Sequence, residues 1–211
     1  MPDRKNVCFL ASGGGGTFRF LCEATSLFNL PLKIVALIAD RECDALTSAK
    51  HYGVATNIVK YTRKDNSQLL ATLKQYSPDL IVTNIHKILD SELLQAFPNK
   101  FINLHYSLLP KYAGMIGMQT VDAAKKNGDT EIGGTCHEVN EIVDNGKILS
   151  QKGFAVDWNQ DIKIIYDEVF RVSCNAFLDG VMKKMHISNT LVQSEKMTND
   201  FWLRVKNAHQ M

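Results

Sequence analysis

The sequence predicts an α/β protein with a doubly wound, mostly parallel sheet, helices on both of its faces and an antiparallel element near the C-terminal half. Short apolar runs alternate with amphipathic helical patterns up to residue 105, as when crossover helices join parallel strands. Residues 32–39 are apolar at nearly every position, which is typical of a strand buried on both faces of a parallel sheet. Asn145-Gly146 is a tight-turn dipeptide between two strand-like segments, which predicts an antiparallel pair.

The first half of the chain carries the alternating elements. A strand over 6–11 runs into the glycine-rich turn 12–16, and a helical pattern follows to about Asn29. Further strands are expected over 32–39, 54–59, 79–83 and 101–105, and helices within 40–52 and over 64–75 and 91–97. The helix at 64–75 is supported by Leu69, Leu70 and Leu73, which share one face.

The second half begins with a helix over 119–127 that ends at Gly128. Strands over 130–139 and 147–156 flank the loop 140–146, and a long amphipathic helix follows over 162–182. The periodicity weakens beyond Met185, so we expect one domain over residues 1–184 and a small C-terminal appendage over 185–211. Phe201 and Trp202 give this appendage apolar surface that a homodimer, or packing within the chain, would bury.

Composition narrows the function classes. The 211 residues are 45% hydrophobic and 22% charged, with a net charge of +2, so neither a nucleic-acid partner nor a membrane surface is expected. No apolar run approaches the length of a membrane span, which is about 18 residues. The N-terminus lacks the pattern of a signal peptide. The five cysteines are dispersed without metal-ligand spacing, which indicates reduced thiols in the cytoplasm and no metal site.

The glycine loop is the first candidate site. Backbone N–H groups of Gly13, Gly14, Gly15 and Gly16, with Thr17, would sit at a helix N-terminus, a place that favours a phosphate or nucleotide ligand. The loop lacks the lysine of a Walker motif, and it misses the third glycine of a dinucleotide fingerprint. A tight turn that only requires small residues explains the glycines as well.

The second candidate is the strand that contains Asn103, His105 and Ser107. Alternate residues of an extended segment point to one face, so an amide, an imidazole and a hydroxyl would lie together. An amide donor next to an imidazole can stabilise an oxyanion and move a proton. Pro110 ends the segment, so the chemistry is expected where the strand stops.

Asp144 could join this group if its loop folds back toward the end of the strand. A carboxylate beside His105 would orient the imidazole and raise its pKa. An acidic residue before Asn-Gly is also a common turn former, so both interpretations stay open. His137 lies in a strand-like segment that could bring it near the site, and nothing else in the sequence supports this.

The order and spacing of these residues resemble the formyltetrahydrofolate-dependent formyltransferases. The match carries Asn-x-His-x-Ser-Leu-Leu-Pro at 103–110 and the Asp-Asn-Gly turn at 144–146, and it extends from the first strand to about Gly180. The resemblance implies a Rossmann-like fold, N10-formyltetrahydrofolate as co-substrate, no metal, and Asn103, His105 and Asp144 as the catalytic trio. It implies folate contacts from two segments, which contain His86, Lys87, Ile88 and Leu89, and Asn140, Glu141 and Val143.

Within that family the sugar N-formyltransferases and phosphoribosylglycinamide formyltransferase resemble the chain most. The plain glycine loop departs from the purine enzyme, and Tyr106, Ser107, Met115 and Met118 would form an apolar, aromatic rim around the acceptor. We therefore expect a nucleotide-linked amino sugar as acceptor, such as a dTDP- or GDP-linked 4-amino-4,6-dideoxyhexose used for surface polysaccharide. The alternatives are phosphoribosylglycinamide, the acceptor of purine biosynthesis, and a non-catalytic nucleotide-binding module.

Overall fold

The structure is a computed structural model that describes residues 4–192 and 196–207. Its contacts divide the chain into two compact units. The first contains the residues up to Phe101 and those from Met185 onward, and the second contains Ile102–Lys184. The expected division into 1–184 and 185–211 stays a prediction.

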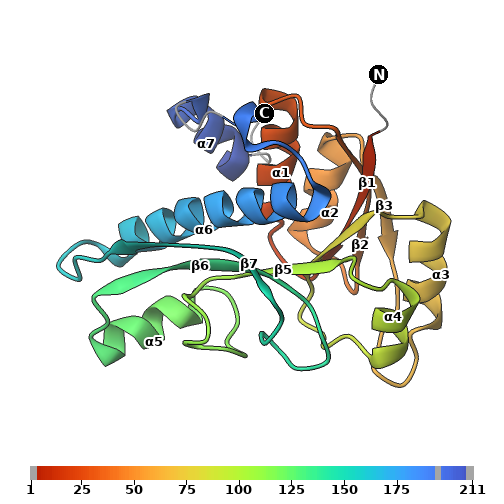
Figure 1. The fold of residues 1–211 in the computed structure, drawn as a ribbon, viewed down its shortest axis with the longest axis horizontal. Coiled ribbons are helices and arrows are strands. Elements are labelled where there is room, and N and C mark those ends of the chain that lie inside the picture. The colour runs from red at the N-terminus through yellow and green to blue at the C-terminus, as the bar shows by residue number, and fades with distance from the viewer. Residues whose placement is uncertain (1–3, 193–195, 208–211) are drawn as a thin grey trace. The chain divides into compact units, whose positions relative to one another are not determined.

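The first unit is built on a parallel sheet with the strand order β3-β2-β1-β4. Its elements are β1 (Lys5–Ala11), α1 (Gly16–Leu27), β2 (Leu32–Ala39), α2 (Asp44–His51), β3 (Ala55–Ile58), α3 (Ser67–Tyr76), β4 (Leu80–Asn84) and α4 (Ser91–Ala96). Figure 1 shows α1 and α2 on one side of these strands and α3 and α4 on the other. The central strand β1 is buried on both faces, since Val7, Cys8, Phe9 and Leu10 are all fully buried.

The second unit contains antiparallel strands in the order β5-β6-β7. Its elements are β5 (Phe101–His105), α5 (Gln119–Asn127), β6 (Glu131–Glu138), β7 (Ile148–Ala155) and α6 (Ile162–Met185). Helix α6 packs closely on β6 through glycines, because a Cβ on Gly134 would clash with Ser173 and one on Gly180 would clash with Cys136.

The predicted α/β class is confirmed, with a parallel sheet covered on both faces and antiparallel strands in the C-terminal half. Element boundaries differ from the predicted ones by up to about three residues. β3 is shorter than the predicted strand 54–59, and α3 begins at Ser67 instead of residue 64. The start of α3 is delayed because Thr62 and Asp65 pair through a turn, and the Asp65 carboxylate then accepts from the Ser67 amide at 3.2 Å.

The C-terminal segment packs inside the first unit. After a short 3-10 turn (Asn189–Leu191), α7 (Asn199–Asn207) lies against α1. The indole of Trp202 stacks on Phe20, with ring centres 5.6 Å apart, and Phe201 meets the same ring edge-on at 5.8 Å. Both side chains are buried within the chain, which removes the apolar surface on which the homodimer prediction rested.

No helix of the described residues is long and apolar enough to cross a membrane.

Candidate active site

Strands β5 and β6 place four polar residues on one face of the second unit. Asn103 pairs with His137 and His105 with Thr135, and directly paired residues of antiparallel strands project from the same face. Gly134 and Cys136 alternate with them and face α6. The predicted alternation of Asn103 and His105 is therefore present at the end of β5.

The β6–β7 loop brings Asp144 to this face. Its Oδ2 lies 3.3 Å from His105 Nδ1, and its Oδ1 lies 3.5 Å from His137 Nε2. Gly114 donates its backbone N–H to the same Oδ2 at 2.7 Å, so a second loop also holds the carboxylate. Gly146 permits the turn, because a Cβ there would clash with the Glu138 carbonyl oxygen.

His105 is buried, and each of its ring nitrogens faces an oxygen atom. Its Nε2 lies 3.0 Å from the Tyr112 carbonyl oxygen, while Nδ1 faces Asp144. A carbonyl oxygen only accepts, so Nε2 carries the proton in this hydrogen bond. Nδ1 is then the nitrogen that can take up a second proton, and the imidazolium formed would lie beside a carboxylate.

Burial and charge act in opposite directions on this pair. Burial lowers the pKa of His105 below its ordinary value, although Asp144 and the Tyr112 carbonyl raise it. Asp144 therefore raises this pKa as expected, but the cost of burying an imidazolium is larger and the net shift is downward. Burial also opposes ionisation of Asp144, but His137, the Gly114 N–H and His105 together leave the pKa of that carboxyl lowered.

His137 belongs to this group, and the sequence did not assign it. The side chain is buried, and Nδ1 lies 2.8 Å from the Glu138 carbonyl oxygen, so Nδ1 carries a proton. Nε2 is buried without a hydrogen-bond partner among the described residues and faces Asp144 at the long distance of 3.5 Å. Asp144 thus lies between two imidazoles. Only the register of β6 against β5, which pairs His137 with Asn103, reveals this position.

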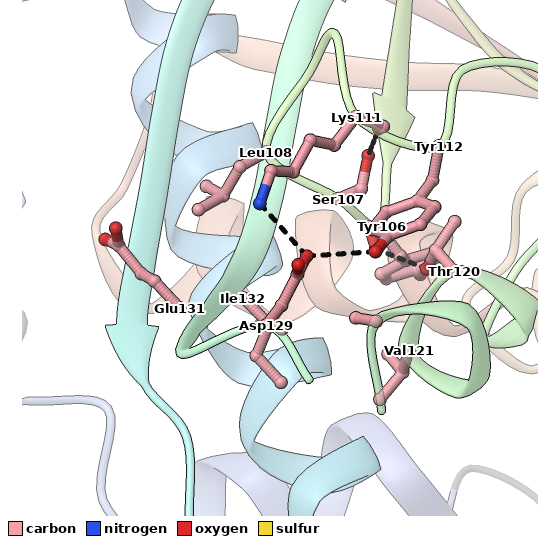
Figure 2. A pocket seen from close by; sticks show the side chains of 11 residues that line it. Tyr106, Ser107, Leu108, Lys111, Tyr112, Thr120, Val121, Asp129, Glu131 and Ile132 are labelled. Atoms are coloured by element: carbon pink, nitrogen blue, oxygen red, sulfur yellow. Dashed lines mark hydrogen bonds and ion pairs between the residues drawn. The ribbon is translucent and has the colours of Figure 1, made fainter. Parts of the chain in front are cut away.

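The loop after β5 is anchored by side chains of β6 and of the segment just before it. Thr135 Oγ1 donates to the Ser107 carbonyl and accepts from the Leu109 N–H. Figure 2 shows Asp129 accepting from the Tyr112 hydroxyl at 3.0 Å and pairing with Lys111 Nζ at 3.2 Å. These contacts fix the backbone at the Tyr112 carbonyl, which accepts from His105.

Of the four predicted rim residues, Ser107 is buried and Tyr106 and Met118 are partly buried against a core. Tyr106 and Met118 pack against a core of Val121, Ala124, Ile132, Ile165 and Val169. The Ser107 hydroxyl is buried and donates to the Lys111 carbonyl. Met115 is 37% exposed, and Tyr106 and Met118 keep part of their surface exposed. The interpretation as core side chains therefore fits Tyr106 and Met118 better than the predicted rim, because the residue after His105 points to the opposite side of the strand.

The glycine loop lies in the first unit, between β1 and α1. Gly15 has a φ of +71°, and a Cβ there would lie 2.8 Å from Ala45 Cα, so this position requires glycine. Cβ atoms at Gly13 and Gly14 would meet nothing within 4 Å. The Thr17 side chain is buried, and the binding of a phosphate by the backbone amides of this loop stays a prediction.

The predicted folate segments lie in different units. In the first, His86, Lys87 and Ile88 are exposed or partly exposed after β4 and Leu89 is buried, and the His86 N–H donates to Ser12 Oγ at 2.8 Å. In the second, Asn140, Glu141 and Val143 are exposed in the β6–β7 loop. Their contact with a folate stays a prediction. The described residues contain no cluster of three His, Cys, Asp or Glu side chains that could hold a metal ion.

Comparison with known proteins assigns this geometry to a family. A family model described as formyl transferase matches residues 5–181, which include every residue of the candidate site. The chain belongs to the formyl transferase family. The formyl donor of these formyl transferases is N10-formyltetrahydrofolate.

This formyl transferase is 35% identical over 156 residues to phosphoribosylglycinamide formyltransferase of Haemophilus influenzae, covering 70% of this chain and 71% of that protein. It is 33% identical over 160 residues to formyltetrahydrofolate deformylase of Escherichia coli, covering 73% of this chain but only 55% of that protein. A crystal structure of phosphoribosylglycinamide formyltransferase from Anaplasma phagocytophilum has a TM-score of 0.75 at 27% identity, with 83% of this chain and 84% of that chain covered.

Proposed function

We propose that this formyl transferase moves the formyl group of N10-formyltetrahydrofolate to the primary amine of phosphoribosylglycinamide. The relative from Haemophilus influenzae, matched over about the same share of both chains, is the observation that carries the proposal. The expected amino-sugar acceptor depended on an apolar rim, and Tyr106 and Met118 are instead partly buried against a core. That argument against phosphoribosylglycinamide therefore loses most of its support.

Asn103 and His105 are the proposed donors to the oxyanion. Attack of the amine on the formyl carbon makes a tetrahedral intermediate with a negative oxygen. The amide of Asn103 and the Nε2–H of His105 would stabilise this oxygen, and one such donor typically contributes about 10²–10³-fold to the rate. To do so, Nε2–H must leave the Tyr112 carbonyl, which it contacts at 3.0 Å.

Asp144 and His105 would handle the proton. One proton leaves the attacking amine and one reaches N10, as the new carbon–nitrogen bond forms and the bond from the formyl carbon to N10 breaks. His105, whose pKa burial lowers, is largely neutral near pH 7 and can accept at Nδ1. Asp144 Oδ2, 3.3 Å from Nδ1, would stabilise the imidazolium that forms. The positive charge of this imidazolium would make its Nε2–H a stronger hydrogen-bond donor.

The glycine loop would hold the phosphate of the acceptor through its amides. Helix α1 begins at Gly16 and directs the positive end of its dipole to this loop. The alternative of another class, a nucleotide-binding module without catalysis, predicts anion binding at the loop and no role for Asn103, His105 or Asp144.

The test is an acceptor panel with N10-formyltetrahydrofolate. The panel contains phosphoribosylglycinamide and both a dTDP-linked and a GDP-linked 4-amino-4,6-dideoxyhexose. A further reaction without any amine is the control. We expect a formylated phosphoribosylglycinamide by mass spectrometry. Formylation of a sugar alone would overturn the acceptor assignment, and release of formate without an amine would indicate deformylation.

A set of variants separates catalysis from binding. His105→Gln should lower kcat about 10²–10⁴-fold, the range for loss of a proton-transfer group. His51→Gln, at an exposed position of α2, is the matched control and should keep full activity. Unchanged kcat in His105→Gln would favour the non-catalytic module.

A further inference from the structure

Arg19, in the first turns of α1, is a buried cation that the proposed reaction does not use. Only 9% of the residue is exposed. Buried arginines are usually paired with a carboxylate, yet the ion pairs of the described residues include none for Arg19. Its guanidinium instead donates to two carbonyl oxygens and a hydroxyl that come from three separate segments.

The first partner is the C-terminal helix. Arg19 Nε donates to the Val205 carbonyl at 2.6 Å. This carbonyl lies in the last turn of α7, where carbonyls lack a partner within the helix and the negative end of the helix dipole attracts a cation. Phe201 and Trp202 pack on α1, and Arg204 Nε donates to Glu23 Oε2 at 2.8 Å, so α7 is attached along its length.

The second partner is the glycine loop. Arg19 Nη1 donates to the Gly14 carbonyl, and also to Ser48 Oγ at 3.1 Å. The Ala45 N–H donates to the Gly13 carbonyl at 3.1 Å, so neighbouring carbonyls of the loop are both held. In a trans peptide the N–H points opposite to the C=O. Fixing the Gly14 carbonyl therefore fixes the direction of the Gly15 N–H, and Ala45 does the same for the Gly14 N–H.

We propose that Arg19 is a positioning residue that couples the C-terminal helix α7 to the amides of the glycine loop, so that α7 sets the affinity for the phosphate of the acceptor. The family model matches residues up to 181, and α7 begins at Asn199, so this support lies beyond the residues that the family model matches. The inference rests on the proposed role of the loop in holding that phosphate. It assigns a function to the segment from Met185 onward.

The test compares Arg19→Gln, Arg19→Lys and Arg204→Gln in the full chain. Arg19→Gln loses the cation and the bridge, and it should raise KM for phosphoribosylglycinamide about tenfold, since small misplacements of a binding group cost that much or more. KM for N10-formyltetrahydrofolate and kcat should stay within about twofold. Arg19→Lys keeps the charge but has a single ammonium group, so its KM for phosphoribosylglycinamide should lie between those of the native chain and Arg19→Gln. Arg204→Gln removes a contact of α7 that does not touch the loop, and should leave both KM values unchanged.

A second readout does not need the acceptor. Inorganic phosphate is titrated into ¹⁵N-labelled protein, and the Gly14 and Gly15 amide resonances are followed. They should shift in the native chain and in Arg204→Gln, and shift only at higher phosphate in Arg19→Gln. If the native chain forms no product with phosphoribosylglycinamide but these amides respond, the acceptor assignment fails and the coupling stands. Equal phosphate affinity and equal KM in Arg19→Gln and the native chain, or amides that never respond, would overturn the coupling, whatever the change in melting temperature.

Discussion

The chemistry of the site is concentrated in one carboxylate between two imidazoles. His105 and His137 each donate from one ring nitrogen to a backbone carbonyl and turn the other toward Asp144. A proton added at Nδ1 of His105 would lie beside the Asp144 carboxylate, 3.3 Å away, which offsets part of the cost of burying the imidazolium. The cluster is thus built to receive a proton, as the proposed transfer requires.

Asp144→Asn tests the carboxylate. The amide keeps the shape but removes the charge that raises the pKa of His105, so that pKa should fall further. We expect kcat to drop about 10²–10⁴-fold, and a histidine NMR titration should show the lower His105 pKa. An unchanged kcat would contradict the role given to Asp144, and a higher His105 pKa would contradict the electrostatics.

His137→Gln tests the second imidazole. The charge of His137 lowers the pKa of His105, so its removal should raise that pKa. The acid limb of the pH profile of kcat/KM should move to higher pH, with a loss in kcat of about tenfold because Asp144 is held less firmly. His186→Gln, at an exposed position just after α6, serves as a control. A profile that coincides with the native one would limit His137 to a structural role.

Among the secondary-structure elements, the turn from β1 into α1 contains glycines of two kinds. Gly15→Ala places a Cβ 2.8 Å from Ala45 Cα at a φ of +71°. This variant should lower the free energy of unfolding by about 1–3 kcal/mol, the range for a strained backbone position. Gly14→Ala is the matched control, because its Cβ meets nothing within 4 Å.

Gly14→Ala should change stability by no more than about 0.5 kcal/mol in urea titrations. A bound phosphate would meet the new methyl group, so KM for the acceptor should rise while the folate KM stays constant. Equal losses of unfolding free energy in Gly14→Ala and Gly15→Ala would contradict the difference in free space at these two glycines.

For the folded molecule as a whole, stability should fall as the pH falls. The folded-state pKa values of His105 and Asp144 both lie below their ordinary values of 6.5 and 3.8, so the unfolded chain binds more protons in these windows. The contribution of His105 is complete above its ordinary pKa and is lost as the pH falls through its lowered pKa. That of Asp144 is lost below about pH 4.

Urea midpoints between about pH 7.5 and about pH 5 measure the histidine part. His105→Gln should be less sensitive to pH over this range than the native chain. A native stability that rises on acidification across the same range would contradict the lowered pKa of His105.

The local sequence pattern was sufficient to predict an element where hydrophobic periodicity or a turn dipeptide was clear. The apolar run of β2, the helical period of α5 and the Asn145-Gly146 turn all predicted elements that the structure contains. The inward turn of Tyr106 and Met118 could not be predicted in the same way, because their burial depends on a core contributed by α5, β6 and α6 together. The same holds for His137, whose partner is chosen by strand register.

Sequence alone was enough for the fold class, and the motif around Asn103, His105 and Asp144 pointed to formyl transfer, because periodicity, turn residues and motif spacing are local properties of the chain. Which side chains surround that motif was established by the folded structure. Burial, which no local pattern measures, lowers the pKa of His105 by more than Asp144 raises it. Packing of α7 on α1 fixed the role of the C-terminal rings, since contacts between segments far apart in the chain depend on the folded core.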